Sequence, residues 1–208
     1  MKIQEIELTK QLYQYQEPSW YEIFNHYNWE ILGTGREAYV ALNPNKNYVL
    51  KIWRKPSSYN KYIDFVKKHP NPHFPRFFRE PRQIRNSNYY YIALEKLEPI
   101  PNLVNTFLPE MTWMGLVFYQ NNLYFQQRHD VNVKLKKFFP DSVVGQNHLV
   151  NNKNLQEKIW DKIGYPPETW KKAVEQIVEF AQSERLDFDL VDFNFMRWHD
   201  TLVITDPF

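Results

Sequence analysis

Asn194 and Asp206 stand at the two ends of a predicted β-hairpin near the end of the sequence. The runs 195–198 and 201–204 have strand-like residues, and the dipeptide His199-Asp200 between them can form a two-residue turn. Adjacent strands lie roughly 5 Å apart. The hairpin would therefore bring Asn194 and Asp206 together at its open end.

The same register makes a prediction about chemistry. It places Asn194 opposite Thr205 and Asp206 opposite Phe193. An amide oxygen beside a carboxylate is a suitable pair of hard ligands for Mg²⁺. Asp189 lies five positions before Asn194, and a loop of that length can bring a third acidic group to the same place. The spacing therefore predicts a magnesium site at Asn194 and Asp206, with Asp189 beside it.

The sequence pattern changes from strand-like to helical near Pro99, and both kinds of element must position these residues. Before it, short apolar runs rich in Val, Ile, Tyr and Trp are broken by Gly, Asn and Pro, which is typical of strands and turns. Strands are predicted near 28–34, 37–42, 47–53, 76–80 and 88–95. One helix is predicted near 59–68. After Pro99 the helical period prevails, and helices are predicted near 103–119, 153–164 and 167–184.

The C-terminal run resembles a known motif. Asp189-Leu190-x-x-x-Asn194, followed by a hairpin and Asp206, is similar to the catalytic loop and the magnesium-binding aspartate of the protein kinase-like superfamily. The resemblance implies that Asn194 and Asp206 hold Mg²⁺ and that Asp189 orients an acceptor hydroxyl and takes its proton. The ending around Asp206 is most similar to small kinase-like proteins of bacteriophages.

The other parts of this pattern occur upstream in the expected order. The segment 33–40 resembles the glycine-rich loop, whose glycines let backbone amides approach phosphate oxygens. Lys51 matches the third-strand lysine that contacts the phosphates of ATP. The run 90–97 resembles the fifth strand and the hinge, where main-chain groups bind adenine. The residues implied to bind the nucleotide are Gly33, Gly35, Val40, Lys51, Glu95 and Leu97.

The resemblance also implies the fold class. The chain would have an α+β, two-lobed protein kinase-like fold. Residues 1–98 would form an N-lobe with an antiparallel sheet, and residues 95–99 would form the hinge. Residues 99–208 would form a truncated, mainly helical C-lobe that carries the catalytic loop and the metal-binding hairpin.

Several positions depart from the superfamily pattern. Asp187-Phe188 stands where His-Arg usually precedes the catalytic aspartate, and Pro207-Phe208 stands where Phe-Gly usually follows the metal-binding aspartate. The sequence ends two residues after Asp206. We therefore expect a platform for the acceptor to come from residues 100–165, to come from a partner, or not to exist.

Lys51 has no obvious acidic partner in the sequence. Within the predicted helix 59–68, Asp64 is the only acidic residue, and its side chain is shorter than that of the usual glutamate. Glu80 is a more remote second choice. The partner of Lys51 is therefore left open between these residues.

Composition excludes several classes of protein. The 208 residues include no cysteine, which excludes disulfides, thiolate catalysis and Cys-ligated zinc. No apolar run is long enough to span a membrane, and the polar N-terminus does not resemble a signal peptide. We expect a cytoplasmic protein, in the host cell if it is of phage origin. A net charge of +2 gives no reason to expect a nucleic-acid partner.

Two further clusters receive an ordinary interpretation. Arg128-His129-Asp130 imitates a catalytic-loop signature, but Leu135 stands where an Asn is needed, so we interpret it as a polar loop. Arginines recur at every third position in Arg76, Arg79, Arg82 and Arg85. They are interpreted as a solvated face in preference to a phosphate-binding stripe.

The predicted function is that of an ATP- and Mg²⁺-dependent phosphotransferase, in particular a phage-type serine/threonine protein kinase-like protein. Its substrate or binding partner would be a host or viral protein. The alternative is a catalytically inactive pseudokinase, or nucleotide-binding module, that acts by binding a host protein. Phosphorylation of a small molecule is a third hypothesis, for which the sequence identifies no acidic pocket.

Overall fold

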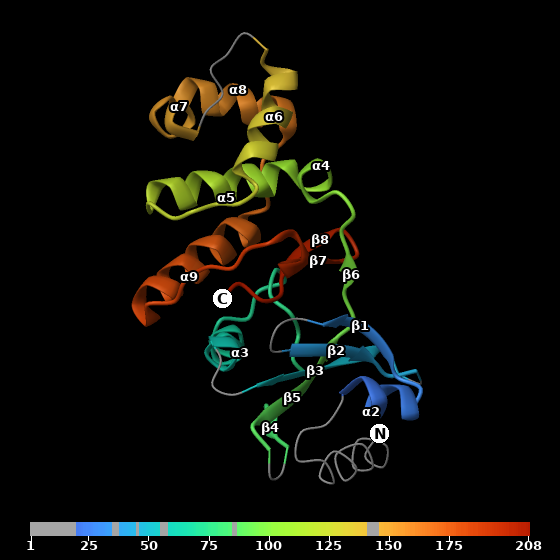
Figure 1. Ribbon diagram of the computed structural model, residues 1–208. Helices are drawn as coiled ribbons and strands as arrows, with labels where there is room; N and C mark the ends of the chain where they lie inside the picture. The colour runs from blue at the N-terminus through green and yellow to red at the C-terminus, as the bar shows by residue number, and fades with distance from the viewer. Residues whose placement is uncertain (1–19, 35–37, 45, 55–57, 85–86, 141–145) are drawn as a thin grey trace. The chain divides into compact units, whose positions relative to one another are not determined.

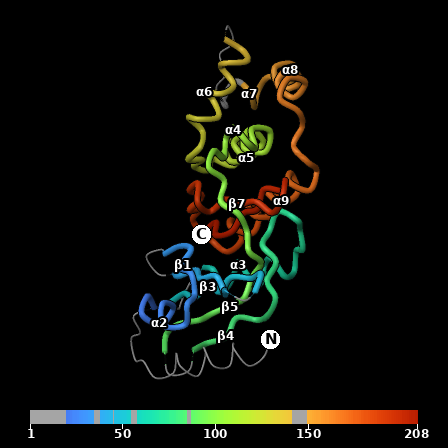
Figure 2. The backbone as a smooth tube through the Cα atoms, turned by 90° about the vertical axis from the view of Figure 1, so that its right-hand side faces the viewer, coloured from blue at the N-terminus to red at the C-terminus, as the bar shows by residue number. Residues whose placement is uncertain are grey.

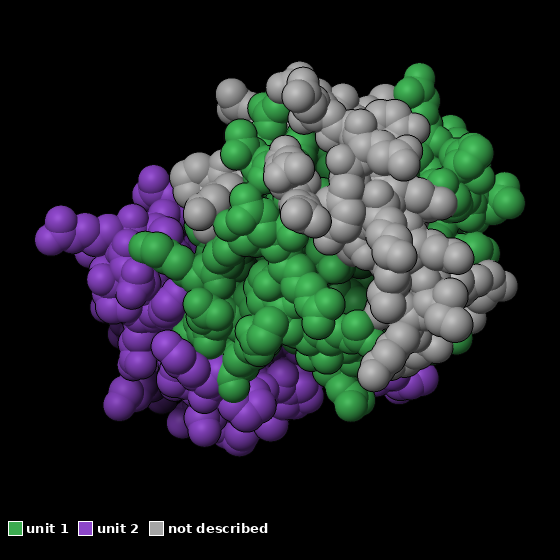
Figure 3. Space-filling view, turned by 90° about the horizontal axis from the view of Figure 1, so that it is seen from below, with its two compact units in different colours: residues 1–67, 75–96 green, residues 68–74, 97–208 purple. Residues whose placement is uncertain are grey.

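The computed structural model describes residues 20–34, 38–44, 46–54, 58–84, 87–140 and 146–208. The chain divides into two compact units, which Figure 3 colours separately. The first comprises Met1–Lys67 with Pro75–Lys96, and the second comprises Lys68–Phe74 with Leu97–Phe208. An antiparallel sheet dominates the first unit and helices dominate the second. The α+β expectation, with a sheet-based N-terminal region and a helical C-terminal region, is confirmed.

The sheet of the first unit has five antiparallel strands in the order β1-β2-β3-β5-β4 (Figure 1). They span Glu30–Thr34 (β1), Ala38–Leu42 (β2), Tyr48–Arg54 (β3), Arg82–Gln83 (β4) and Tyr89–Glu95 (β5). The central strand β3 is buried at every position except its last. Burial on both faces explains its nearly continuous run of β-branched, aliphatic and aromatic residues. Lys51 lies in the middle of this strand.

One predicted strand is corrected. Residues 76–80 form no strand; Phe77 makes an isolated bridge to Leu94, and the fourth strand is Arg82–Gln83 instead. Pro75 and Pro81 bracket the segment. A proline has no N–H to donate, so it limits the ladder on either side of Phe77.

Two helices accompany this sheet. Helix α3, Ser58–Lys68, agrees with the predicted helix and buries one face, made of Tyr59, Tyr62, Ile63, Phe65 and Val66. Helix α2, Trp20–His26, was not predicted. Its seven residues are too few to show a helical period, and its Trp20 and Phe24 join the core cluster with Trp29 and Leu50. Tertiary burial therefore determines this short helix.

Helices form most of the second unit. They are α4 Leu103–Thr106, α5 Leu108–Gln120, α6 Arg128–Phe138, α7 Gln146–Asn151, α8 Lys153–Ile163 and α9 Glu168–Glu184. The predicted helix 103–119 is interrupted at Phe107, two residues before the Pro109 that stands in the first turn of α5. The predicted face of α9 is confirmed: Trp170, Val174, Ile177, Val178 and Ala181 are all buried.

The interpretation of Arg128-His129-Asp130 as a loop was wrong. These residues form the first turn of α6. The helix buries only Val131 and Leu135 on one side, and two apolar positions among many polar ones give a weak periodic signal.

A second, three-stranded sheet lies in the second unit, in the order β6-β7-β8. Its strands are Glu98–Pro99 (β6), Phe195–Trp198 (β7) and Thr201–Ile204 (β8). Figure 2 lets the chain be followed from β5 through β6 into α4. The predicted hairpin and its register are confirmed, since Phe195 pairs with Ile204 and Trp198 with Thr201. His199 adopts a positive φ of 52° in the turn, as a tight hairpin requires.

Among the described residues, no helix combines the length and apolar character needed to cross a membrane.

Candidate functional site

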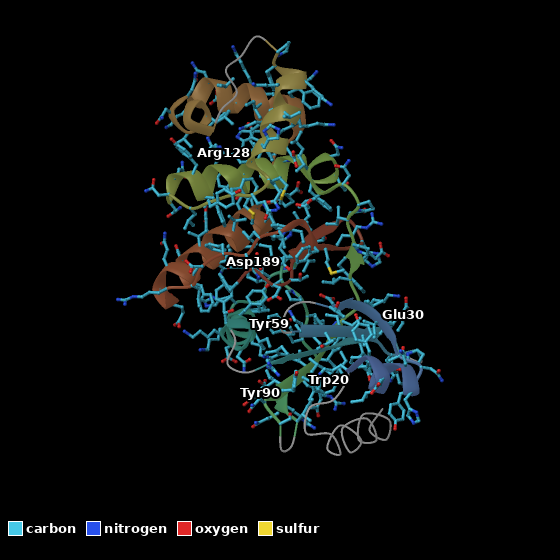
Figure 4. The ribbon with its side chains drawn as sticks, viewed as in Figure 1. Trp20, Glu30, Tyr59, Tyr90, Arg128 and Asp189 are labelled. Atoms are coloured by element: carbon cyan, nitrogen blue, oxygen red, sulfur yellow. The ribbon has the colours of Figure 1, made fainter. Side chains whose placement is uncertain are left out.

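The loop that carries Asp189 begins where α9 ends. Arg185 has a left-handed backbone (φ 54°, ψ 48°), and the N–H of Leu186 donates to the carbonyl of Ala181 at 2.9 Å. This combination is a common way of ending a helix and turning the chain. The redirected segment runs past the exposed Asp189, labelled in Figure 4, toward the hairpin.

Four consecutive carbonyls of this loop, those of residues 189–192, each accept a hydrogen bond. The Asn194 side-chain amide donates to Asp189 at 2.5 Å, and the Asn194 backbone donates to Val191 at 2.9 Å. The Phe195 N–H donates to the carbonyl of Asp192. Gln127 donates to Leu190 at 3.0 Å. These hydrogen bonds therefore hold the loop in a defined conformation.

Hydrogen bonds at the open end of the hairpin hold Asn194 close to the segment that contains Asp206. The carbonyl of Asn194 accepts both the N–H (2.9 Å) and the hydroxyl (3.0 Å) of Thr205, which directly precedes Asp206. The N–H of Asp189 donates to the carbonyl of Pro207 at 2.8 Å, directly after Asp206. Asp189, Asn194 and Asp206 are thus brought together within the second unit.

The side chains of these three residues differ in exposure. Asn194 is buried, Asp206 is half-buried and Asp189 is exposed. The Asn194 amide nitrogen is used by the Asp189 carbonyl, so its oxygen is the atom suited to a cation. No group of three or more His, Cys, Asp or Glu side chains in the described part of the chain can hold a metal ion. A site with one amide and one carboxylate fits Mg²⁺, which keeps water and substrate phosphate oxygens as its other ligands.

Phe188 and Phe208, which flank the candidate residues in sequence, belong to one aromatic cluster. The ring of Phe188 lies 4.8 Å from that of Phe118 in α5 and 5.3 Å from that of Phe208. Phe208 also lies 5.8 Å from Phe180 in α9. The residue before Asp189 and the residue after Pro207 are therefore packed on each other and on two helices. Apolar packing positions this loop where the superfamily pattern has an arginine.

His73 supports the outer strand of the hairpin from within the same unit. Its Nδ1 lies 2.7 Å from the carbonyl of Leu202 and its Nε2 lies 3.0 Å from the Thr169 hydroxyl. A carbonyl only accepts, so Nδ1 carries the proton and Nε2 accepts from the hydroxyl. Burial lowers the pKa of His73, and the hydrogen bond to Leu202 partly opposes that shift. The neutral imidazole is thus the form that holds β8.

Lys51 is buried in the first unit. In β3 it pairs with Val40 of β2 and Ile92 of β5, and only 7% of its surface is exposed. Its Nζ lies 3.5 Å from the centroid of the Tyr59 ring of α3, a residue labelled in Figure 4. A cation over an aromatic face is stabilised by the ring quadrupole.

The acidic residues considered as partners for Lys51 are placed differently. Asp64 is exposed on α3. Glu80 forms an ion pair with Lys67 at 2.5 Å. The contact of Lys51 with Tyr59 was not predicted, because an uncharged aromatic residue at the start of a helix does not look like the partner of a lysine in the sequence.

The glycine-rich segment is only partly described. Gly35 lies outside the described residues. Gly33 lies in β1 at a register shift between Ile31 and Gly33, and a Cβ added there would meet no atom within 4 Å. A side chain at position 33 would thus meet no steric obstacle among the described residues, and Val40 on β2 pairs with Lys51.

The two residues predicted to bind adenine lie on either side of the chain's passage between the units. Glu95 ends β5; its N–H donates to the carbonyl of Arg76 at 3.0 Å, and its carboxylate accepts the Arg76 N–H at 2.8 Å. Leu97 belongs to the second unit and is buried. Binding of adenine by their main-chain groups stays a prediction, as do the ligand roles of Lys51, Asn194 and Asp206.

Comparisons with known proteins give limited information. No family model matches the chain, and no curated protein matches its sequence. One similar solved structure is the ternary complex of streptomycin, ATP and APH(2'')-IIa, at 14% identity and a TM-score of 0.35. The match covers 89% of this chain and 69% of that one. A TM-score this low leaves function to be argued from the residues themselves.

Proposed function

We propose that this protein binds ATP with Mg²⁺ and transfers a phosphoryl group to a hydroxyl acceptor. The observation that carries the proposal is the hydrogen-bonded unit of loop and hairpin that brings Asp189, Asn194 and Asp206 together. An exposed carboxylate beside an amide and carboxylate pair is the set of groups that phosphoryl transfer needs.

Each residue has a distinct role in this proposal. Asn194 and Asp206 hold Mg²⁺, which neutralises charge on the phosphates when it is bound. Lys51 supplies a fixed positive charge for the phosphates. Asp189 orients the acceptor hydroxyl and takes its proton as the hydroxyl oxygen bonds to the γ-phosphorus of ATP, while the bond from that phosphorus to the bridging oxygen breaks and ADP leaves. Phe188 and Phe208 pack against each other and support the loop that carries Asp189.

We further propose that the acceptor is a serine or threonine hydroxyl of a host or viral protein, as the resemblance to phage kinase-like proteins implies. The exposure of Asp189 supports this acceptor class. A carboxylate at the surface is accessible to a macromolecule without a closed small-molecule pocket.

The experiment measures Mg²⁺-dependent transfer from labelled ATP to proteins of a host-cell extract. Wild type should label a protein, and Asp189→Ala should abolish that labelling. Asp187→Ala is the matched control, because Asp187 is an exposed aspartate two positions earlier in the same loop. Equal labelling by wild type and Asp189→Ala would contradict the role of Asp189. No labelling by wild type would contradict transfer to a protein.

A second candidate function is a nucleotide-binding module without transfer, acting through a host protein. The contact between Lys51 and Tyr59 is the observation that favours this module, because the ring engages the ammonium that a transferase would direct at the phosphates. Thermal unfolding distinguishes the two. A ligand at 100 times its Kd stabilises a protein by about 2.7 kcal/mol. Stabilisation by ATP and Mg²⁺ without labelling supports this module, whereas stabilisation with labelling supports the transferase.

A further inference from the structure

Gln127 is a buried side chain that contacts the candidate catalytic loop from outside it. Only 2% of its surface is exposed. Its Nε2 donates to two acceptors, the Leu190 carbonyl at 3.0 Å and the Asp192 Oδ1 at 2.8 Å. These two residues lie between Asp189 and Asn194. One amide therefore connects α6 to the middle of the loop.

The backbone of Gln127 is held in place by the helical core. Its carbonyl accepts the Val131 N–H at 3.0 Å in the first turn of α6, and Val131 is buried. Two residues earlier, the buried Phe125 packs against Phe118 of α5 at 6.0 Å. The amide thus extends from a backbone position that the helical core holds.

The orientation of the amide is determined by its neighbours. Both Leu190 O and Asp192 Oδ1 are acceptors, so the group that faces them must be a donor. The Gln127 Oε1 is buried and accepts no hydrogen bond from the described residues. Turning the amide over would place oxygen against oxygen. The position therefore requires a donor of this length, and a carboxylate would be repelled there.

The contact matters because of what the loop carbonyls do. Those of Asp189, Val191 and Asp192 are satisfied by donors from Asn194 and Phe195 within the same segment. The carbonyl of Leu190 receives its hydrogen bond from Gln127. This bond sets the position of the segment between the two functional residues relative to the helices.

We propose that Gln127 is a positioning residue, which holds the loop so that Asp189 and Asn194 face the metal and the acceptor together. This inference rests on the proposed function. It assigns a role to the α6 region, which has no counterpart in the motif that suggested that function. Gln127 acts through Leu190 and Asp192 and does not itself touch the reacting atoms.

The first test is Gln127→Glu, which keeps the shape and removes the donor. Two adjacent carboxylates repel each other, and one of them retains its proton to a higher pH. At pH 8 we expect transfer to fall about 10- to 100-fold relative to wild type, the range typical of residues that orient ligands. As the pH falls toward 5, a protonated carboxyl can donate again, so the ratio to wild type should recover.

Gln126→Glu is the matched control, because Gln126 is the adjacent glutamine and is exposed. Its ratio to wild type should stay close to one at every pH. A Gln127→Glu variant as active as wild type at pH 8 overturns the inference. So does a loss that does not change with pH, since that would reflect general damage to the fold.

The second test does not depend on catalysis. Hydrogen exchange of residues 186–195 is measured in wild type, Gln127→Met and Gln126→Met. Gln127→Met should speed exchange of the Asp189 and Asn194 amides, which donate to Pro207 and Val191, while exchange within α9 stays unchanged. Unchanged loop exchange overturns the inference. Faster loop exchange in a protein that binds no ATP upholds it and refutes the proposed function instead.

Discussion

The candidate functional residues of the two units are held by different forces. In the second unit, Asp189, Asn194 and Asp206 are positioned mainly by backbone hydrogen bonds within a short loop and a hairpin. In the first unit, Lys51 is positioned by burial in β3 and by the Tyr59 ring of a helix. Local hydrogen bonds depend on the functional residue itself, whereas the packing around Lys51 does not. The same kind of substitution should therefore have different structural consequences in the two units.

The largest expected effect comes from comparing Asn194→Ala with Lys51→Met. Both should reduce phosphoryl transfer by about 100-fold or more, because each removes a group that stabilises charge in the transition state. Only Asn194→Ala should also destabilise the fold, by about 1–3 kcal/mol, since it leaves the Asp189 carbonyl without its donor. Lys51→Met loses the ring contact of the ammonium but also removes the cost of burying a charge, and it keeps an apolar chain of similar size. These changes oppose each other, so the free energy of unfolding should change little.

Urea unfolding of the two variants beside wild type measures this difference. An Asn194→Ala variant as stable as wild type would show that the amide contributes nothing to the loop. A Lys51→Met variant that is clearly less stable would show that the lysine is structural, and the contrast between the units would then disappear.

The second comparison is between two phenylalanines of the same segment. Phe188 packs on Phe118 and Phe208, whereas Phe193 is 77% exposed. Phe188→Ala should lower the free energy of unfolding by about 2–3 kcal/mol, somewhat less than for a fully buried ring. Phe193→Ala should change it by less than about 0.5 kcal/mol. Thermal or urea unfolding measures both changes. Equal losses of stability in Phe188→Ala and Phe193→Ala would mean that the aromatic cluster does not hold the loop.

A smaller effect is expected between Lys51 and Tyr59. A desolvated cation over an aromatic ring contributes about 1–2 kcal/mol. A double-mutant cycle of Lys51→Met and Tyr59→Leu should therefore give a coupling energy of this size in urea unfolding. Tyr59→Phe is the control, because it keeps the ring and should preserve the coupling with Lys51. A coupling energy near zero would mean that the first unit positions the lysine by burial alone.

The smallest effect concerns a half-buried carboxyl in α5 of the second unit. Burial raises the pKa of Glu110, and a hydrogen bond from its own backbone partly opposes the shift. Because its folded-state pKa lies above its unfolded value, the group costs stability once the pH rises above about 4.5 and through the folded pKa. Glu110→Gln should thus stabilise the protein at pH 7.

The advantage of Glu110→Gln should disappear below pH 4.5, where the carboxyl is protonated in both states. Urea unfolding of variant and wild type across pH 4 to 8 measures the difference. The Glu175→Gln variant serves as the control, since Glu175 is exposed on α9. If Glu110→Gln and wild type differed in stability by the same amount at all pH values, titration of Glu110 would not be the cause of the difference.

Much of the backbone arrangement around Asn194 in the second unit was predictable from sequence. The hairpin register follows from a two-residue turn between strand-like runs, and the structure places Asn194 opposite Thr205 as expected. The periodic face of α9 was equally clear. These features depend on residues close together in the chain, so a local pattern contains them.

Long-range packing accounts for what the sequence did not reveal. Gln127 lies more than sixty positions from Leu190 and Asp192, and a single glutamine carries no motif. Tyr59 reaches Lys51 only because α3 packs on the sheet. The departures at Phe188 and Phe208 became intelligible only as one aromatic cluster.

By itself, the sequence determined which groups stand together at the hairpin, because turn spacing and strand period act over a few residues. The tertiary structure alone decided what holds those groups and what faces Lys51. Hydrogen bonds and ring contacts between distant segments depend on how helices and strands pack, and no local spacing encodes that packing.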